Sequence, residues 1–296
     1  MSVWLGYEAP QLCVDLPDRE LATAVRELFS GYLRDADGGV EVRADPPPVR
    51  IRVRGARNGY RIEGEAELLN GLKAVTTATR MEALVRVEAA VARGLLSLRP
   101  EVAHVHGAGS VLGGGGVLAL GDSGAGKSTL AFHWSMSGRP LLGDDVVLLD
   151  AEGRIHPFRR VVKVPSDRVV ERGLDPRETL YWSDGSPEAW FDPRRAGGWA
   201  RRPVRPSVIA LLGRTSGGGA RLEDVDPAEA LAEILAGVLP TGASQAESID
   251  PIRSMLLRAR VVRVSYENSR GAAELLERLV GSVEGRLAAG NGVERP

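Results

Sequence analysis

Residues 121–128 read Gly-Asp-Ser-Gly-Ala-Gly-Lys-Ser, a complete match to the phosphate-loop pattern G-x-x-x-x-G-K-[ST]. The chain has 296 residues but only three lysines, at positions 73, 127 and 163. By chance such a pattern would arise in roughly one chain of this composition in a few hundred. A simple glycine-rich turn is the alternative, because 36 residues are glycine. The rarity of lysine favours a phosphate-binding loop.

The residue types in this motif suit a bound triphosphate. Glycines let the backbone curl so that several N–H groups converge on phosphate oxygens. Lys127 carries a positive charge on a flexible stem that can reach the β and γ phosphates, and the Ser128 hydroxyl suits Mg²⁺. We therefore predict binding of ATP or GTP together with Mg²⁺. The residues expected to contact the nucleotide are Gly121, Asp122, Ser123, Gly124, Ala125, Gly126, Lys127, Ser128 and Thr129.

The segments on either side of the motif support this interpretation. Residues 117–120 form a short apolar run that predicts a buried strand leading into the loop. Residues 127–137 can form a helix whose N-terminus faces the phosphates, and Gly138 would end it. The loop is therefore expected between a strand and a helix.

Composition narrows the classes of partner. The formal net charge is −1, so general electrostatic binding to nucleic acid or to an anionic membrane is not expected. Cys13 is the only cysteine, which excludes an internal disulfide and a cysteine-based metal site. The chain shows no secretory signal pattern and no apolar run long enough to span a membrane. We predict a soluble cytoplasmic protein.

Hydrophobic patterning divides the chain into an α+β half and an α/β half. Residues 21–32 have helical spacing, and 49–53 alternate with arginine as a half-buried strand that Asn58-Gly59 would turn into a hairpin. Thr79 and Glu82 form a candidate capping box for a helix that reaches about residue 98. The expected parts are a small α+β domain in 1–80, a bridging helix in 81–100, a phosphate-loop core in 101–286 and a flexible tail in 287–296.

Strands and helices alternate after residue 101, which indicates an α/β nucleotide-binding core. The expected strands are 103–106, 117–121, 146–149, 208–212 and 261–266, and the expected helices are 127–137, 227–238 and 271–286. Between residues 165 and 206 the pattern gives way to a segment rich in Gly, Pro and Arg. The Trp182–Trp199 part of this segment either forms a lid or acceptor groove, or pins an irregular loop to the core.

A second group of residues narrows the family. Asp144-Asp145 comes before the apolar run 146–149, 17 residues after Lys127, and His106 lies 15 residues before the loop. This arrangement resembles the catalytic core of HPr kinase/phosphorylase and of the kinases related to it. The resemblance covers residues 104–150 in detail. It implies a core of the HPr kinase and ATP-dependent carboxykinase type.

The resemblance also implies roles for individual residues. Asp144 would be the base that accepts the proton of a serine hydroxyl, and His106 its hydrogen-bonded partner. Asp145 would lie near the Mg²⁺ held by Ser128, and Lys127 would act on the transferred phosphate. These roles agree with phosphoryl transfer, in which the protein mostly positions reactants and neutralises charge.

The chain also departs from HPr kinases proper. It has Thr129 where they have Glu, and it lacks their later glycine-rich signature, so phosphorylase activity is not predicted. Residues 157–160, Pro-Phe-Arg-Arg, resemble an element of the divergent HPr kinase-like proteins, some of which act on serine in peptides or as the free amino acid. Arg159 and Arg160 are candidates for phosphate or acceptor contacts.

Several other residues are weaker candidates. His104 competes with His106 on the same strand face, whereas His133 and His156 have no predicted role. A further acidic metal ligand is sought among Glu171, Glu178 and Asp192.

The function predicted is an ATP- and Mg²⁺-dependent serine kinase, whose acceptor is a protein, a peptide or a free metabolite and which is a possible homo-oligomer. Two alternatives stay open. One is a nucleotide-dependent regulator without a phosphoacceptor, and the other is an enzyme of the carboxykinase type.

Overall fold

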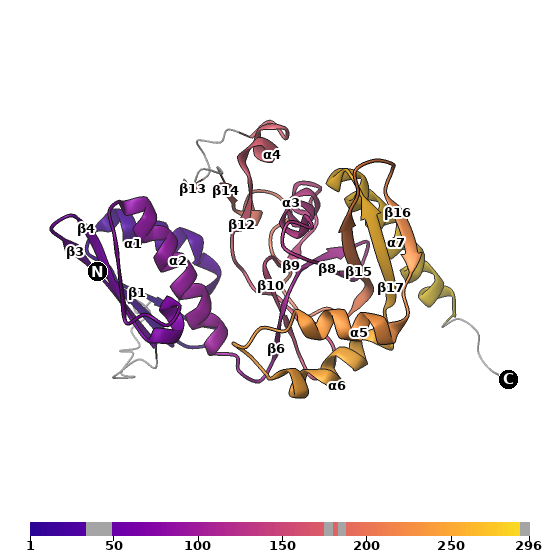
Figure 1. Ribbon diagram of the computed structural model, residues 1–296, viewed down its shortest axis with the longest axis horizontal. Coiled ribbons are helices and arrows are strands. Elements are labelled where there is room, and N and C mark those ends of the chain that lie inside the picture. The colour runs from indigo at the N-terminus through magenta and orange to yellow at the C-terminus, as the bar shows by residue number, and fades with distance from the viewer. Residues whose placement is uncertain (34–48, 175–179, 183–187, 291–296) are drawn as a thin grey trace. The chain divides into compact units, whose positions relative to one another are not determined.

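The computed structural model describes residues 1–33, 49–174, 180–182 and 188–290 (Figure 1). The chain divides into two compact units. Unit 1 comprises Met1–Pro100 and Trp182–Pro187, and unit 2 comprises Glu101–Tyr181 and Glu188–Pro296. Each unit has its own sheets and helices and is described separately below. Among the described residues, no helix combines the length and the apolar character needed to cross a membrane.

Unit 1 is a five-stranded sheet with two helices. The sheet order is β1-β2-β3-β4-β5, and only β2 and β3 run parallel to each other. Its elements are β1 (Ser2–Leu5), β2 (Leu12–Asp15), α1 (Arg19–Leu28), a 3₁₀ turn (Ser30–Tyr32), β3 (Val49–Ala56), β4 (Gly59–Glu63), a 3₁₀ turn (Ala66–Leu69), β5 (Ala74–Thr77) and α2 (Arg80–Ser97).

Alternation of apolar and basic residues sets the orientation of β3. Ile51 and Val53 are buried, whereas Arg52 and Arg54 between and beyond them are exposed. The predicted hairpin is confirmed, since β3 pairs with β4 antiparallel and Ala56 lies opposite Gly59. The strand therefore places its apolar side chains in the core and its arginines in solvent.

The predicted capping box of α2 is confirmed. The Thr79 hydroxyl accepts from the Glu82 N–H at 3.1 Å, and the Glu82 carboxylate accepts from the Thr79 N–H at 3.3 Å. The helix expected to bridge the two halves packs instead against β2, β3, β4 and β5 as a member of unit 1. The N-terminal helix is shorter than its periodicity suggested, because α1 ends at Leu28 and Tyr32 lies in the following 3₁₀ turn.

Unit 2 is built around a six-stranded sheet of order β16-β17-β15-β8-β7-β9. The three strands β17, β15 and β8 run parallel, and β16, β7 and β9 are added antiparallel at the two sides. The strands are β7 (Ala108–Leu112), β8 (Gly115–Leu120), β9 (Leu141–Gly143), β15 (Pro206–Arg214), β16 (Arg221–Asp224) and β17 (Arg260–Tyr266).

Two smaller sheets complete unit 2. One has the order β11-β10-β6 and the other the order β12-β14-β13. Their strands are β6 (Ala103–His106), β10 (Val146–Leu149), β11 (Ile155–His156), β12 (Val162–Pro165), β13 (Leu180–Trp182) and β14 (Glu188–Phe191). The helices of unit 2 are α3 (Lys127–Met136), α4 (Ser166–Val170), α5 (Pro227–Ala236), α6 (Gln245–Leu256) and α7 (Ser269–Gly290), with a 3₁₀ turn at Pro193–Arg195.

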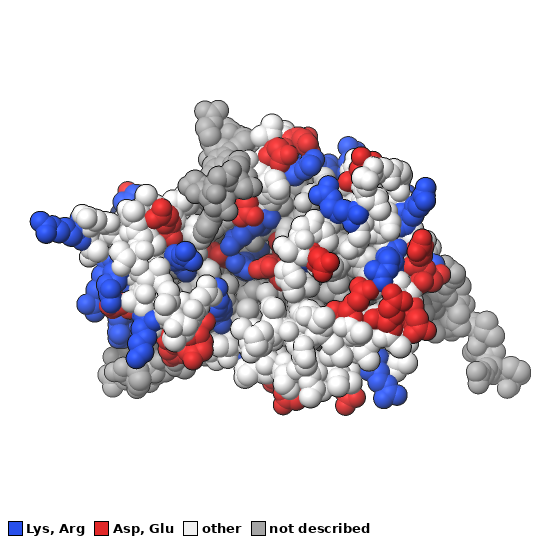
Figure 2. Space-filling view, in the orientation of Figure 1, with Lys and Arg blue, Asp and Glu red and all other residues white. Residues whose placement is uncertain are grey.

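The central sheet is covered on both faces, so its inner strands are apolar throughout. Alternate residues of β8 enter different cores: Val117 and Ala119 pack in a cluster with residues of α3 and α7. Leu118 and Leu120 pack in the opposite cluster, with residues of α5, α6, β6 and β10. This layered arrangement is a mixed α/β fold with several sheets. On the face drawn in Figure 2, acidic and basic side chains are interspersed, in keeping with the balanced composition.

The predicted strands and helices of the core are present with small shifts of their ends. The prediction missed β7, β9, β11, β12, β16 and α6, the last of which contains Pro251 and begins at a capping box formed by Ser244 and Glu247. The segment 165–206, expected to be irregular, begins with α4 and contains β14, which pairs with β12. Short strands of three to five residues give too little pattern to be found this way.

Two helical glycines, one buried in unit 1 and one exposed in unit 2, allow the effect of an added methyl group on stability to be compared. A Cβ on Gly94 of α2 would lie 2.2 Å from Leu12 Cδ1, in the buried contact between α2 and β2. A Cβ on Gly281 of α7 would have no atom within 4 Å. We expect Gly94→Ala to lower the free energy of unfolding by about 1–3 kcal/mol through overpacking, and Gly281→Ala to raise it by about 0.5–1 kcal/mol.

Urea denaturation followed by circular dichroism measures both changes. Stabilisation by Gly94→Ala would contradict the close packing of α2 on β2.

Candidate functional site

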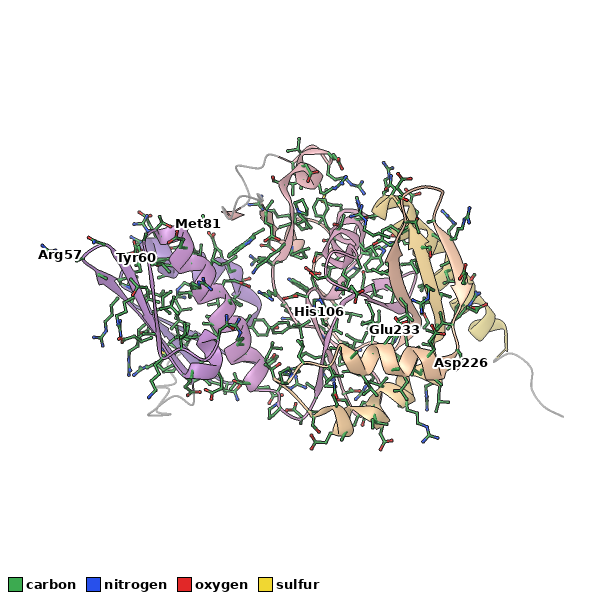
Figure 3. The ribbon with its side chains drawn as sticks, viewed as in Figure 1. Arg57, Tyr60, Met81, His106, Asp226 and Glu233 are labelled. Atoms are coloured by element: carbon green, nitrogen blue, oxygen red, sulfur yellow. The ribbon has the colours of Figure 1, made fainter. Side chains whose placement is uncertain are left out.

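The candidate site lies where the chain crosses twice between two sheets of unit 2. At His106 the chain leaves β6, and after Gly107 it enters β7 of the six-stranded sheet. At Asp144-Asp145 it crosses back, from β9 into β10 beside β6. The Gly107 N–H donates to the backbone oxygen of Asp145 at 3.3 Å, which holds the crossings together. Figure 3 labels His106 at the end of β6.

The loop of residues 121–126 lies between β8 and α3, the strand–loop–helix order that the sequence predicted. Gly121, Gly124 and Gly126 have φ values of 144°, 81° and 98°, a region that only glycine adopts at little cost. Gly126 is the N-cap of α3, and Lys127 is its first residue. The loop therefore places backbone N–H groups at the start of a ten-residue helix, which is the arrangement that favours an anion.

A buried tyrosine fixes one peptide of the loop. Tyr266 ends β17, is fully buried, and donates its hydroxyl hydrogen to the backbone oxygen of Ala125. In a trans peptide the C=O and the next N–H point in opposite directions. The Gly126 N–H is therefore directed away from Tyr266. A side chain at Gly126 would collide with Tyr266, because its Cβ would lie 2.5 Å from the Tyr266 hydroxyl.

Lys127 is held against its own loop. Its Nζ donates to the backbone oxygens of Gly121 at 2.7 Å and Asp122 at 2.9 Å. The side chain is buried, and desolvation lowers the pKa of the ammonium while Asp144 and Asp145 oppose that shift. The charge is thus placed inside the loop with only carbonyl oxygens as direct partners among the described residues.

Asp144 is a buried carboxyl whose Oδ1 has no hydrogen-bond partner in the described part of the chain. Asp144 as a whole is 2% exposed. Desolvation, with the nearby charge of Asp145, raises its pKa to about 7, and a hydrogen bond from Ser128 and the charge of Arg160 limit the rise. A buried polar atom without a partner is costly, and this one lies beside the phosphate loop.

Asp145 has the opposite environment. Its side chain is about half exposed, and Arg160 Nη1 donates to its Oδ2 at 2.7 Å. A hydrogen bond with His106 is the main cause that holds the pKa of Asp145 well below its usual range, and the Arg160 charge adds to it. Its φ is 67°, which is strained for a residue with a side chain.

The histidine pairs with the second aspartate rather than the first. His106 Nδ1 lies 2.8 Å from the backbone oxygen of Asp145 and 3.4 Å from Oδ1. Both atoms are acceptors, so Nδ1 carries the hydrogen, and this contact raises the pKa of His106. The predicted His106–Asp144 pair is thus not what the structure contains. Asp145 presents both its backbone oxygen and its carboxylate to His106, whereas Asp144 is buried beside Ser128.

A cleft of about 430 Å³ in unit 2 is lined by His106, Asp145 and Arg160 together with the loop residues Ser123, Gly124, Gly126, Lys127, Ser128 and Thr129. Asp144 is not part of this lining, since it is buried beside Ser128. Sequence reasoning missed five further lining residues, Val161, Lys163, Pro165, Glu188 and Arg214. Lys163 could have been singled out from the sequence, since the chain has only three lysines.

The remaining histidines have structural partners. His104 is fully buried with Nδ1 2.8 Å from the Thr241 hydroxyl, and His156 Nε2 lies 2.8 Å from Asp150 Oδ2. His133 accepts from Arg172 at 2.7 Å. His104 is therefore no competitor of His106 for a place in the cleft.

The tryptophan segment is partly core. Trp190 is buried on β14, and Lys163 Nζ lies 4.9 Å from the centre of its ring. Trp199 packs against the main cluster of unit 2, so these two residues pin the segment rather than form a free lid. Nothing is described of the side chain of Trp182.

Ser128 and Asp144 are the residues that fit a bound Mg²⁺. A hydroxyl and a carboxylate beside a phosphate cleft match the few protein ligands that Mg²⁺ takes when substrate phosphates and water supply the rest. The partnerless Asp144 Oδ1 is the observation that supports this fit. Asp145, predicted as the metal-side acid, is engaged by His106 and Arg160 instead.

Within the described residues, neither Glu171 nor Asp192 joins them, and neither lines the cleft. The described residues contain no group of three or more His, Cys, Asp or Glu side chains able to hold a metal. Glu171 pairs with Arg168 and Asp192 with Arg194, and the third candidate, Glu178, lies outside the described residues.

No model of a known protein family matches the chain, and no curated protein matches it. Among solved structures, the Hpr(Ser) kinase/phosphatase from Coxiella burnetii is similar over 62% of this chain and 98% of its own length. The sequence identity is 16% and the TM-score is 0.31. This is a weak relation at the level of the fold, and it says nothing about activity.

The environment of Asp144 predicts how stability depends on pH. The folded pKa of about 7 lies above the ordinary value of 3.8, so the stabilisation by the protonated form is complete below about pH 4. It is lost as the pH rises through 7. Asn cannot ionise, so Asp144→Asn should gain about 2–3 kcal/mol relative to wild type between about pH 5 and pH 8.

Denaturation of both proteins without ligand at several pH values measures this difference. Asp224→Asn is the control, since Asp224 is exposed and Arg260 lowers its pKa. A pH-independent difference between wild type and Asp144→Asn would contradict the raised pKa.

Proposed function

We propose that the protein is an ATP- and Mg²⁺-dependent phosphotransferase that transfers the γ-phosphate to a hydroxyl acceptor. The observation that carries this proposal is the pair of adjacent carboxyls with opposite environments at the phosphate-loop cleft, Asp145 in its lining and Asp144 buried beside Ser128. Asp144 is buried with an unsatisfied oxygen, and Asp145 is ionised and held by His106 and Arg160. Sites that separate the pKa values of two acids are suited to giving them different roles.

The loop residues would bind the triphosphate. The backbone N–H groups at the start of α3 favour phosphate oxygens, and Lys127 can exchange the Gly121 and Asp122 carbonyls for phosphate. Ser128 and Asp144 would hold the Mg²⁺, which neutralises charge on the phosphates when bound. A nearby cation also favours the ionised form of Asp144.

Asp145 would orient the acceptor hydroxyl. Its carboxylate reaches the cleft, and His106 and Arg160 fix its position. In the transfer, the acceptor oxygen bonds to the γ-phosphorus and the bond to the bridging oxygen of the diphosphate breaks. The hydroxyl proton passes to Asp145 and then to water. A carboxylate of low pKa is a sufficient proton acceptor when the transition state is loose, because the hydroxyl proton is then transferred late in the reaction.

This assignment exchanges the roles that the resemblance to HPr kinases implied for the two aspartates. The partners in the structure support the exchange, since the histidine contacts Asp145 and Ser128 interacts with Asp144. The acceptor class stays as the sequence suggested: a serine hydroxyl in a protein, a peptide or a free metabolite.

Two isosteric variants separate the roles. Asp145→Asn should bind Mg-ATP within about twofold of wild type but lose transfer by about 10² or more, because the acceptor is no longer oriented. Asp144→Asn should lose the increase in ATP affinity that Mg²⁺ gives. Lys127→Ala should weaken both binding and transfer.

Calorimetric titration of ATP with and without Mg²⁺ measures binding, and mass spectrometry of free serine, serine peptides and an HPr-like protein measures transfer. Asp250→Asn, exposed on α6, is the control and should match wild type. Loss of Mg²⁺-dependent affinity in Asp145→Asn, with Asp144→Asn unaffected, would restore the original roles. ATP hydrolysis without any phosphorylated product would favour the nucleotide-dependent regulator.

The hydrogen bond from Tyr266 to the Ala125 carbonyl gives a separate prediction. Tyr266→Phe removes the hydroxyl that holds the Ala125 carbonyl, so the Ala125–Gly126 peptide can rotate and its N–H can leave the cleft. A lost hydrogen bond to a charged group corresponds to roughly 1.5–3 kcal/mol, so ATP affinity should fall about tenfold or more.

The same titration measures this effect, with Tyr60→Phe in unit 1 as the control. Unchanged ATP affinity in a folded Tyr266→Phe would show that the peptide keeps its orientation without the Tyr266 hydroxyl.

A further inference from the structure

A second cavity adjoins the phosphate cleft in unit 2. It has a volume of about 570 Å³ and shares two lining residues, Thr129 and Arg214, with the cleft. Thr129 directly follows Ser128 in α3, and Arg214 ends β15 beside the loop. The two cavities therefore meet at the side of the phosphate loop that leads into α3.

The lining of this cavity comes from four places in unit 2: α3, the α4 region, the end of β15, and the connection from β17 into α7. Arg168 and Arg172 lie in or just after α4, and Arg270 is in the first turn of α7. Glu267 belongs to the short connection between β17 and α7. His133, on the second turn of α3, also lines the cavity.

Much of the positive charge in this cavity is already balanced. Arg168 Nη1 lies 3.0 Å from both carboxylate oxygens of Glu171, and Arg270 Nε donates to Glu274 at 3.1 Å. Arg172 donates to His133 Nδ1 at 2.7 Å, and burial together with the arginines lowers the pKa of His133 to about 4. His133 is therefore neutral near pH 7, and the guanidinium groups of Arg168, Arg172 and Arg270 are held by hydrogen bonds through their N–H groups.

The direction of a triphosphate in the cleft follows from the loop. The lysine of a phosphate loop reaches the β and γ phosphates, so the γ end lies toward Lys127, Asp145 and His106. The α-phosphate and whatever it carries must leave on the other side. Thr129 and Arg214 are on that side, at the junction with the second cavity.

We propose that this second cavity binds the base and ribose of the nucleotide, with the base stacked on the guanidinium planes of Arg172 and Arg270. The charge of these guanidinium groups is partly balanced by their partners, so the cavity attracts a second anionic group only weakly. A neutral, flat base can still stack on guanidinium planes. The Glu267 carboxylate offers an acceptor for ribose hydroxyls. This inference rests on the proposed binding of ATP in the phosphate cleft.

Comparison of ATP with inorganic tripolyphosphate tests the proposal, because the two ligands differ by the nucleoside. We expect wild type to bind Mg-ATP more tightly than Mg-tripolyphosphate in calorimetric titrations of the full chain. Arg172→Ala and Arg270→Ala should each weaken ATP binding by about fivefold or more, from the loss of stacking. Their tripolyphosphate affinity should change by less than about twofold.

Arg258→Ala removes an exposed arginine just after α6, outside both cavities, and should match wild type for both ligands. Arg270 is itself exposed, so its variant should fold even where Arg172→Ala disturbs His133. Equal losses for both ligands, or equal affinities of wild type for both, would overturn the nucleoside site alone. No binding of either ligand by wild type would overturn the proposed function instead.

Discussion

The backbone oxygen of Asp145 is the point on which the candidate site depends. It accepts from the Gly107 N–H and from His106 Nδ1, so it joins the two places where the chain crosses between sheets. His106 and Val146 are register partners in β6 and β10, which fixes the histidine opposite the aspartate turn. The residues that lie far apart in the chain therefore meet at one edge of the fold, next to the strand that leads into the phosphate loop.

Burial separates the two adjacent aspartates and so gives them different chemistry. Asp144 is enclosed and shares space with Ser128 and Lys127, whereas Asp145 faces Arg160 at the cleft. Two neighbouring carboxyls that were both exposed would ionise together, and the cleft would then repel phosphate. Here one carboxyl titrates near neutral pH, so its charge can follow the arrival of a cation.

The parts of the site that follow from local sequence were predictable, and those that follow from topology were not. The loop, its strand and its helix depend on glycines and on an apolar run within a short stretch. The pairing of His106 with Asp145 and the positive φ of Asp145 are revealed by no pattern in the sequence. Tyr266 and Arg214 come from strand ends far along the chain, and only the parallel register of β8, β15 and β17 brings them to the loop. The strands β12 and β14, at the start of and within the segment 165–206, were not predicted. Each has only four residues, which is too short for an alternating hydrophobic pattern to be recognised.

The connection that follows β17 links the two cavities mechanically. Tyr266 at the end of this strand holds the Ala125 peptide, and the next residues, Glu267 to Arg270, line the second cavity. A shift of this connection would move the N–H groups of the loop as well as the wall of the second cavity. The Ala125–Gly126 peptide and one wall of the second cavity therefore both adjoin this short connection beside α3. A smaller apolar residue at this strand end would fill less space than the fully buried tyrosine and would leave the Ala125 carbonyl without its buried donor.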